Sequence, residues 1–460
     1  MTLDQGTDYK VKKIYVKPNS RFSLQYHEKR DEYWTIVEGG GTITLENLGD
    51  IINQDVKPGD DYYIPVNSLH RLQGGDDGVT FIEVQRGVCE ESDIVRLADD
   101  YDRSWQSIPN LVELIIRINE MKKVLITGGA GFIAHHLIGQ ILKTTDWQII
   151  SLDRLDYSGN LNRLHDIMLS FDPEERKRVR IVHHDLKAAL NPLVCSEIGQ
   201  VDFILHLAAG SHVDRSIDYP MEFVLDNVVG TANILDFART QDNLEKFVYF
   251  STDEVFGPAP NGIKYKENDR YNSTNPYSAT KAGGEELAVA YENTYKLPIY
   301  ITHTMNVFGE RQHPEKFIPM TIKNVRDGNT VTIHSDATRT IPGSRHYIHA
   351  EDVSSAILFL LNYQGTFEPT WGNAKCPKFN IVGSEELNNL ELAQIIADAQ
   401  DKELKYELVD FHSSRPGHDL RYALDGDKMK QLGWEPAKSV RERIADVTKW
   451  TLENKRWISL

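Results

Sequence analysis

The sequence predicts an α/β protein in which an N-terminal all-β barrel is followed by a doubly wound parallel sheet with a smaller C-terminal lobe. Three observations predict this organisation. From Lys12 to about Gln85, short segments of period-2 hydrophobicity are broken by turns, which is typical of a barrel or sandwich. From Met121 onward, strand-like and helical segments alternate, as in βαβ units. Past Gly309 this alternation loosens, which indicates the smaller lobe.

The first domain is expected over residues 1–110 and the second over 121–460, with the boundary near 105–120. An apolar helical pattern over 107–120 is expected to close the first block. The strands expected in the first domain cover residues 21–27, 33–45, 61–72 and 79–85.

In the second domain, expected strands alternate with helical patterns, which predicts a parallel sheet. The expected strands cover residues 122–127, 147–153, 179–184, 201–209, 246–252 and 298–306. The expected helices cover residues 134–145, 221–240 and 278–296.

The composition is that of a soluble globular protein, with 40% hydrophobic and 26% charged residues. A formal net charge of −17 repels phosphate backbones and anionic lipids, so we expect no nucleic-acid or membrane partner. Cys89, Cys195 and Cys376 lie far apart in the sequence, which favours neither a disulfide framework nor a thiolate metal site. There is no signal-peptide pattern and no apolar run near the ~18 residues of a membrane helix, so we expect a cytoplasmic protein.

A glycine-rich turn at 127–134 (TGGAGFIA) lies between an expected strand and an expected helix. Glycines there let the backbone approach a pyrophosphate, which the helix N-terminus then faces. Asp153 ends the next expected strand, about 20 residues on, where a carboxylate accepts hydrogen bonds from ribose hydroxyls. An acid there disfavours a 2′-phosphate, so the sequence predicts NAD rather than NADP. A glycine turn alone can simply pack a helix on a sheet, but the strand context and Asp153 favour a dinucleotide site.

Tyr277 and Lys281 are four residues apart, so they share one face of an expected helix. We expect the ammonium to lower the pKa of the phenol, so that Tyr277 takes a hydroxyl proton while a hydride leaves for the nicotinamide. This spacing is common by chance, but here it follows a dinucleotide motif. Residues 251–254 (Ser-Thr-Asp-Glu) end an expected strand. Adjacent carboxylates at a strand end are usually a solvated turn, but in this context they can serve as an acid and a base.

Residues 121–460 closely resemble the nucleotide-sugar 4,6-dehydratases, the extended short-chain dehydrogenase/reductase family typified by dTDP-glucose 4,6-dehydratase. The resemblance implies a Rossmann-type sheet, bound NAD, and usually a homodimer. It also implies a nucleoside-diphosphate hexose of the dTDP- or UDP-glucose type as the substrate. The motifs that carry it are TGGAGFIA, LDRLDYSGNLNRL, HLAAGSHVDRSI, STDEVFG, NPYSATKA, HPEKFIP and RPGHDLRYALD.

The resemblance also implies a role for each residue. Tyr277 removes the C4 hydroxyl proton with help from Lys281 and Thr252, and NAD takes the C4 hydride. Glu254 then acts as the base at C5 while Asp253 protonates the leaving C6 hydroxyl, and the hydride returns to C6. The implied cofactor contacts are Gly128, Gly131, Phe132, Ile133, Asp153, Asp185 near the adenine, Ala208, Ala209, Tyr277 and Lys281. The implied substrate contacts are Ser211, Asn306, Arg345, Arg415 and His418, with the arginines as diphosphate clamps unless they are only surface ion-pair partners.

The match has departures that leave the nucleotide and the hexose open. Ala134 replaces the third glycine of the turn, the family's NNYGPYHFPEK reads NVFGERQHPEK, and His334 stands where a tyrosine is typical near the base. An NAD-dependent nucleotide-sugar 4-epimerase is the alternative activity, because it shares Tyr277, Lys281 and NAD. An epimerase needs no acid and base at C5 and C6, so the two carboxylates at 253–254 favour the dehydratase.

In the first domain, ligand-type side chains fall in two spaced elements. Gln25 and His27 are two apart on an expected strand and so point to the same face, and Glu32 and His70 follow. Two imidazoles, a carboxylate and an amide inside a barrel would suit a divalent metal such as zinc with open positions. Polar barrel residues that merely hydrogen-bond one another are the plainer interpretation, but four such residues in this spacing favour a metal.

This spacing resembles the two-part cupin signature, with Gln25 in place of its first histidine. Residues 10–103 resemble the mannose-6-phosphate isomerase module of bifunctional mannose-1-phosphate guanylyltransferases, through SLQYH, EYW, YIPVNSLHRL and FIEVQRG. The resemblance implies a sugar phosphate whose carbonyl a metal polarises during isomerisation. Glu28 and Lys29 replace histidines that are frequent in the family. A structural or sugar-binding cupin is therefore the rival interpretation.

Overall fold

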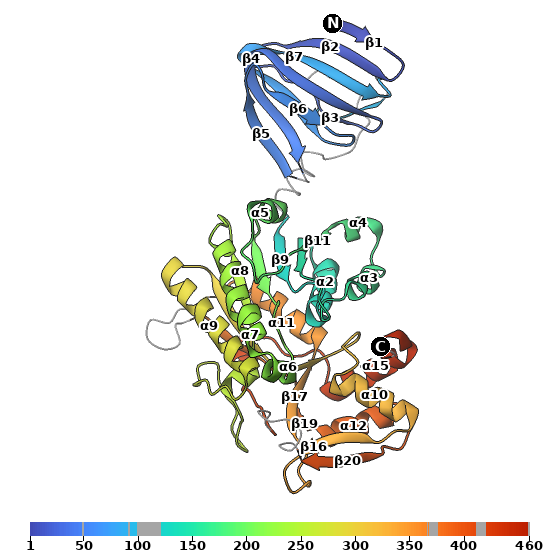
Figure 1. Ribbon diagram of the computed structural model, residues 1–460, viewed down its shortest axis with the longest axis vertical. Helices are drawn as coiled ribbons and strands as arrows, with labels where there is room; N and C mark the ends of the chain where they lie inside the picture. Colours follow the sequence, from blue (N-terminus) through green and yellow to red (C-terminus); the bar gives the residue numbers. More distant parts are fainter. Residues whose placement is uncertain are drawn as a thin grey trace. The chain divides into compact units, whose positions relative to one another are not determined.

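The computed structural model describes residues 1–47, 50–90, 93–98, 121–365, 367, 376–410 and 420–458. Two compact units make up the chain, Met1–Glu120 and Met121–Leu460 (Figure 1). The helix expected over 107–120 lies outside the described residues. Within the described ranges, no helix is both long enough and apolar enough to cross a membrane.

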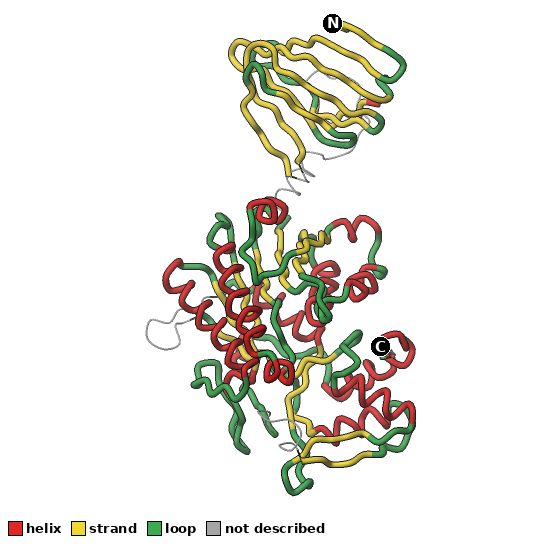
Figure 2. The backbone as a smooth tube through the Cα atoms, viewed as in Figure 1, coloured by secondary structure: helices red, strands yellow, loops and turns green. Residues whose placement is uncertain are grey.

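The described part of the first unit is built almost entirely from antiparallel β-strands (Figure 2). Two long strands, β4 (Arg30–Asn47) and β7 (His70–Gly87), pair along much of their length and organise the others. One path through the sheet runs β1-β2-β7-β3-β8, and β4 also pairs with β5 and β6. These strands are β1 (Thr2–Gln5), β2 (Tyr9–Val16), β3 (Leu24–His27), β5 (Asp50–Val56), β6 (Asp61–Ile64) and β8 (Ile94–Ala98).

Alternation along β4 sets the interior of this unit. Trp34 and Ile36 are buried in an apolar cluster with Phe81 of β7. Glu32 lies two residues before Trp34, so it points to the same side and is fully buried. The inward row therefore changes from apolar to charged side chains at Glu32, which is the arrangement expected of a binding site in a β-barrel.

The second unit is organised by a parallel sheet. Among the described residues, seven strands pair in the order β11-β10-β9-β12-β13-β14-β18. Along the chain, the sheet starts in the middle at β9, extends through β10 to β11, and then continues on the other side of β9 with β12. This reversal makes a doubly wound sheet of the Rossmann type. The strands are β9 (Lys123–Thr127), β10 (Gln148–Asp153), β11 (Val179–His183), β12 (Phe203–His206), β13 (Lys246–Thr252), β14 (Ile299–Thr304) and β18 (Lys378–Ile381).

Helices cover both faces of this sheet. Val124 and Ile126 of β9 pack in a cluster with α2 and α11, whereas Leu125 between them packs with α5, α8 and α9. The long helices are α2 (Phe132–Thr144), α8 (Gly230–Ala238), α9 (Pro276–Tyr295) and α11 (Ala350–Asn362). The shorter helical segments are α3 (Leu161–Met168), α4 (Pro173–Lys177), α5 (Pro192–Ile198), α6 (Val213–Asp218), α7 (Pro220–Val224), the π-helical η2 (Leu225–Val229) and the 3₁₀ turn η3 (Asp253–Phe256).

The smaller lobe has its own core. Helices α10 (Phe317–Asp327), α12 (Asn389–Asp398) and α15 (Val440–Glu453) pack with small sheets in one apolar cluster. Those sheets are β15-β17-β19 and β16-β20. Their strands are β15 (Asn306–Phe308), β16 (Val331–Ser335), β17 (Ser344–His349), β19 (Glu386–Asn388) and β20 (Tyr406–Asp410). The 3₁₀ turn η4 (Lys455–Trp457) follows α15, whereas α14 (Asp427–Leu432) packs on β18 in the core of the parallel sheet. The fold class predicted from the sequence is confirmed.

Candidate active site

The glycine turn between β9 and α2 has the geometry that its sequence predicts. Gly128 has φ +69°, and a Cβ there would lie 2.9 Å from the backbone of Ala208. Only glycine fits that conformation and that close approach. Gly131 is the N-cap residue of α2, so the N–H groups in the first turn of this 13-residue helix face the glycine turn.

Asp153 ends β10, and its carboxylate braces two turns. Its Oδ2 accepts a hydrogen bond from the Ala130 N–H (3.0 Å) and its Oδ1 accepts one from the Leu155 N–H (2.8 Å). Burial raises its pKa. The carboxylate thus fixes the glycine turn and the start of the following loop against each other, and it has further lone pairs for a ligand hydroxyl.

A cavity of about 610 Å³ joins this turn to the carboxyl edge of the sheet and to the smaller lobe. It brings together the described residues that the sequence assigned to cofactor, substrate and catalysis. Arg415 and His418 lie outside the described residues. The sequence-assigned residues that line the cavity are Gly128, Gly131, Phe132, Ile133, Asp153, Asp185, Ala208, Ala209, Ser211, Thr252, Asp253, Glu254, Tyr277, Lys281, Asn306 and Arg345.

The carboxyl end of β13 and the 3₁₀ turn after it present the paired carboxylates. Thr252 caps the turn, and its hydroxyl donates to Oδ1 of Asp253 (3.0 Å). Asp253 is buried, and its Oδ2 has no hydrogen-bond partner among the described residues. Burial raises the pKa of Asp253 to about 6, although the positive charge of Arg345 offsets part of the rise. Burial therefore keeps this carboxyl protonated to a higher pH than an exposed aspartate, which suits a general acid.

Glu254 is held from the neighbouring helix. Asn275 Nδ2 donates to Oε2 of Glu254 (3.0 Å), while the Asn275 side-chain oxygen accepts from the Ser278 N–H and caps α9. Sequence reasoning missed Asn275, although an asparagine directly before Pro276 is a recognisable helix-cap signal. The hydrogen bond from Asn275 holds one carboxylate oxygen of Glu254, and Glu254 lines the cavity.

Tyr277 and Lys281 lie in the first turns of α9, and both line the cavity. The expectation that Lys281 lowers the pKa of Tyr277 is wrong here: burial and the charge of Glu254 raise that pKa, and a hydrogen bond with Thr252 offsets only part of the rise. Lys281 Nζ donates instead to the Phe250 carbonyl oxygen (2.5 Å). Burial lowers the pKa of Lys281 to about 7. The amine is therefore a proton donor or acceptor near neutral pH.

The sugar-side residues come from the smaller lobe and from the ends of the sheet strands. Arg345 is the second residue of β17. Its guanidinium donates to the Leu420 carbonyl oxygen (2.6 Å) and lies 4.7 Å from the centre of the Tyr422 ring. Asn306 and Ser211 are exposed on the cavity wall. Arg345 also acts electrostatically on Asp253, so the lobe contributes charge to the catalytic end of the cavity.

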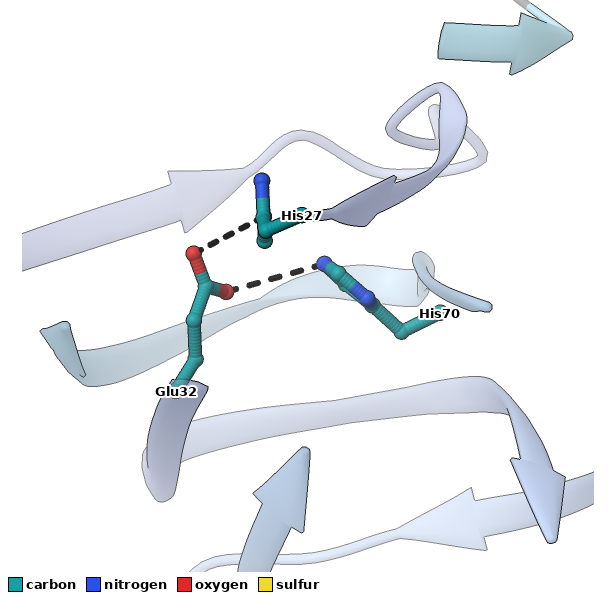
Figure 3. A group of neighbouring side chains, drawn as sticks. All are labelled: His27, Glu32 and His70. Atoms are coloured by element: carbon teal, nitrogen blue, oxygen red, sulfur yellow. Dashed lines mark ion pairs between the residues drawn. The ribbon is translucent and has the colours of Figure 1, made fainter. Parts of the chain in front are cut away.

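The barrel of the first unit contains a second constellation of functional side chains. His27, Glu32 and His70 are buried, and one potential ligand atom from each lies within 4.8 Å of the others (Figure 3). His27 Nε2 is 2.9 Å from Glu32 Oε1, and His70 Nε2 is 3.6 Å from Glu32 Oε2. Gln25 is paired in register with His70, so it shares that face, and its Oε1 accepts from the Ser23 hydroxyl (2.8 Å).

The tautomer of His70 suits a metal ligand. Its Nδ1 lies 3.0 Å from the Ser68 carbonyl oxygen, so this nitrogen carries the proton. Its Nε2 is buried without a hydrogen-bond partner among the described residues and faces Glu32. Burial lowers the pKa of His70 to about 4, which keeps the ring neutral. The two imidazoles and the carboxylate therefore fit a divalent cation.

Comparisons with known proteins agree with this architecture. Residues 125–447 match the GDP-mannose 4,6 dehydratase family, and residues 1–99 match the C-terminal domain family of mannose-6-phosphate isomerase. The dTDP-glucose 4,6-dehydratase of Salmonella typhimurium is 34% identical, over 73% of this chain and 94% of that protein. The low-salt glycan biosynthesis protein Agl12 of Haloferax volcanii is 38% identical, over 70% and 96%.

A solved dTDP-glucose 4,6-dehydratase from Streptomyces venezuelae, with NAD bound, is similar in structure. It has a TM-score of 0.63 and 35% identity, over 73% of this chain and 99% of that one. The second unit supplies this likeness, because the match in sequence and the doubly wound sheet both fall there. The chain belongs to the GDP-mannose 4,6 dehydratase family and carries an N-terminal domain of the mannose-6-phosphate isomerase C-terminal type.

Proposed function

We propose that the second unit is a nucleoside-diphosphate-hexose 4,6-dehydratase that acts on a dTDP- or UDP-glucose-type sugar with NAD. The observation that carries this proposal is the placement of Asp253 and Glu254 in one cavity with Tyr277 and Lys281. Oxidation at C4 needs only the last two, whereas loss of water across C5 and C6 also needs a base and an acid. The dTDP-glucose 4,6-dehydratases among its relatives support the same reaction.

In this proposal each residue moves or holds a proton at a defined atom. Tyr277 takes the C4 hydroxyl proton, with Thr252 hydrogen-bonded to it and Lys281 one turn further along α9. NAD supplies a hydride acceptor and later donor. The 4-ketone acidifies C5–H, which Glu254 removes while Asp253 gives its proton to the C6 hydroxyl. The C6–O bond breaks, water leaves and a C5–C6 double bond forms. Return of the hydride to C6, with the proton from Glu254 returned to C5, would then give the 4-keto-6-deoxy sugar with no net oxidation.

A substrate panel tests the proposal. The protein is incubated separately with dTDP-glucose, UDP-glucose, GDP-mannose and their N-acetylated relatives, and the products are identified by mass spectrometry. Loss of one water from a single nucleotide sugar is the expected result, and it identifies the substrate. An epimerised product of unchanged mass from any of them would replace the dehydratase with the 4-epimerase. Arg415 and His418 are proposed substrate contacts, and their substitution should raise KM in the same assay.

For the first unit we propose a divalent metal at His27, Glu32 and His70, with Gln25 as a further ligand. The buried Nε2 of His70 faces Glu32 and has no hydrogen-bond partner among the described residues, which favours this function over a purely structural barrel. The metal would polarise the carbonyl of a sugar phosphate during isomerisation. Isothermal titration of the full chain with Zn²⁺, paired with a mannose-6-phosphate turnover assay, tests both parts. Metal binding without turnover would leave a sugar-binding domain, and turnover abolished by chelator would establish an isomerase.

A further inference from the structure

The Glu32 carboxylate is already surrounded by side-chain nitrogen atoms. Its Oε1 lies 2.9 Å from His27 Nε2, 3.0 Å from Gln85 Nε2 and 3.1 Å from Arg30 Nε. Its other oxygen accepts from Trp34 Nε1 (3.0 Å). Arg30 is two residues before Glu32 on β4, so it points to the same face, and only 2% of the residue is exposed. A permanent cation therefore lies beside the proposed metal ligands.

The two histidines differ in how the chain presents them. His70 has the arrangement of a prepared ligand, with Nδ1 bonded to a carbonyl and Nε2 facing Glu32. His27 has the reverse arrangement, because its buried Nδ1 has no partner among the described residues, while its Nε2 lies 3.3 Å from Arg30 Nη2. The nitrogen of His27 that faces Glu32 is thus the one that the guanidinium contacts. A metal ion and Arg30 would compete for that atom and for Glu32.

A second carboxylate lies on the other side of the guanidinium. Arg30 Nη1 donates to the Glu90 carbonyl oxygen (2.9 Å) and lies 3.8 Å from Oδ2 of Asp93. Asp93 is 6% exposed, and neither of its carboxylate oxygens has a hydrogen-bond partner within the described part of the chain. A buried carboxylate without hydrogen bonds is costly. A small movement of Arg30 toward Asp93 would satisfy it and would release Glu32 and His27.

We propose that Arg30 is an internal competitor for the metal, which enters as the guanidinium moves from Glu32 to Asp93. The inference rests on the proposed metal site. Repulsion between a guanidinium and a divalent cation in a buried site makes the two arrangements mutually exclusive. Asp93 lowers the cost of the metal-bound arrangement because it receives the displaced cation. Arg30 and Asp93 together would then set the affinity of the site.

If Arg30 instead supports the metal site, removing it should change the metal affinity in the opposite direction. If Arg30 held Glu32 in place as a supporting neighbour of a ligand, its removal would weaken metal binding, by roughly 10- to 100-fold for such residues. If Arg30 competes with the metal, its removal strengthens binding. The sign of the change therefore decides between the two roles.

The experiment titrates Co²⁺ into the full-length protein and follows both heat and the visible d–d absorption. We expect Arg30→Met to bind at least about tenfold more tightly than the wild type, since a neighbouring positive charge is removed. We expect Asp93→Asn to bind more weakly. In the double variant the Asp93→Asn change should have no effect, because Arg30 is absent. Arg86→Met is the matched control: Arg86 pairs with Asp31 on the exposed side of β4, and its loss should leave affinity unchanged.

Each outcome has a distinct meaning. If the wild type binds Co²⁺ and Arg30→Met binds it with equal or lower affinity, the competition is overturned but the metal site is retained. Absence of binding in both proteins would overturn the metal site itself and the inference with it. Binding by Arg30→Met alone would support the competition in its strongest form. If Arg30→Met does not fold, as judged by thermal unfolding, Arg30→Gln and Asp93→Asn carry the test, and an unchanged affinity in Asp93→Asn contradicts the proposal.

Discussion

Asn275 uses its two side-chain atoms for two tasks, since its oxygen caps α9 and its nitrogen donates to Glu254 at 3.0 Å. The helix that carries Tyr277 and the carboxylate proposed as the C5 base are therefore positioned by a single residue. A change at Asn275 can separate these tasks. Aspartate caps a helix as well as asparagine does, but it offers Glu254 a negative charge in place of a donor.

We predict that Asn275→Asp retains the fold but moves the acid limb of the pH–rate profile upward. The added carboxylate raises the pKa of Glu254, so a higher pH is needed to ionise the base. The profile of kcat against pH measures the shift. Asn275→Ala is the control for the cap, and it should cost about 1 kcal/mol of stability. An unchanged profile in Asn275→Asp would show that Glu254 does not ionise in the rate-limiting step.

Glu254→Gln should separate oxidation from elimination. The variant retains Tyr277 and Lys281, so NADH is expected to accumulate in the presence of the nucleotide sugar. Without a base at C5, water is not lost and the hydride is not returned. Absorbance at the NADH band and product mass measure the two steps in one sample. Product formed at the wild-type rate would contradict the role given to Glu254.

Tyr277→Phe should stop the reaction one step earlier. The variant lacks the phenol that is proposed to take the C4 hydroxyl proton, so NADH absorbance should not develop on mixing with the substrate. We expect a loss of about 10²- to 10⁴-fold in kcat, the usual contribution of a general base. Nucleotide-sugar binding, measured by calorimetry, serves as the control and should be retained. Wild-type NADH formation would assign the proton transfer to another group.

Asp253→Asn should stabilise the protein and inactivate it. Burial raises the pKa of Asp253 from 3.8 to about 6, so between those values the folded state binds more protons than the unfolded state. Stability therefore falls as the pH rises from about 4 to about 6, and the ionised carboxylate costs on the order of 3 kcal/mol at pH 7. We expect a higher Tm for Asp253→Asn at pH 7 and no gain near pH 4. A lower Tm at pH 7 would show that the charged form is well compensated.

Much of this site could be predicted because it follows from short-range rules. Period 3.6 places Tyr277 and Lys281 on one face of α9, and the carboxyl end of β13 places Thr252 beside them. The expected effect of Lys281 on the pKa of Tyr277 was wrong. Lys281 donates to the Phe250 carbonyl oxygen, and burial controls the pKa of Tyr277, because both depend on packing that the sequence does not show.

In the barrel as well, the burial and contacts of a charged side chain could not be predicted from the sequence. The spacing of His27, Glu32 and His70 predicted a cluster, and the structure brings their side chains together. Arg30 was overlooked although it is two residues from Glu32 and must share its face. An arginine among expected metal ligands is read as a solvated charge until burial shows where the guanidinium lies. Its exposure of 2% and its contact with His27 could come only from the fold.

The two hydrogen bonds that Asp153 accepts fix the loops on either side of the dinucleotide turn during folding. A ligand that binds there orders little additional backbone, so the entropic cost of association is small and binding is favoured. Tight binding would suit the proposed dehydratase, in which the same NAD molecule must keep the hydride until the sugar has lost water. For the proposed reaction, Asp153 would thus contribute to retaining the cofactor between the two hydride transfers.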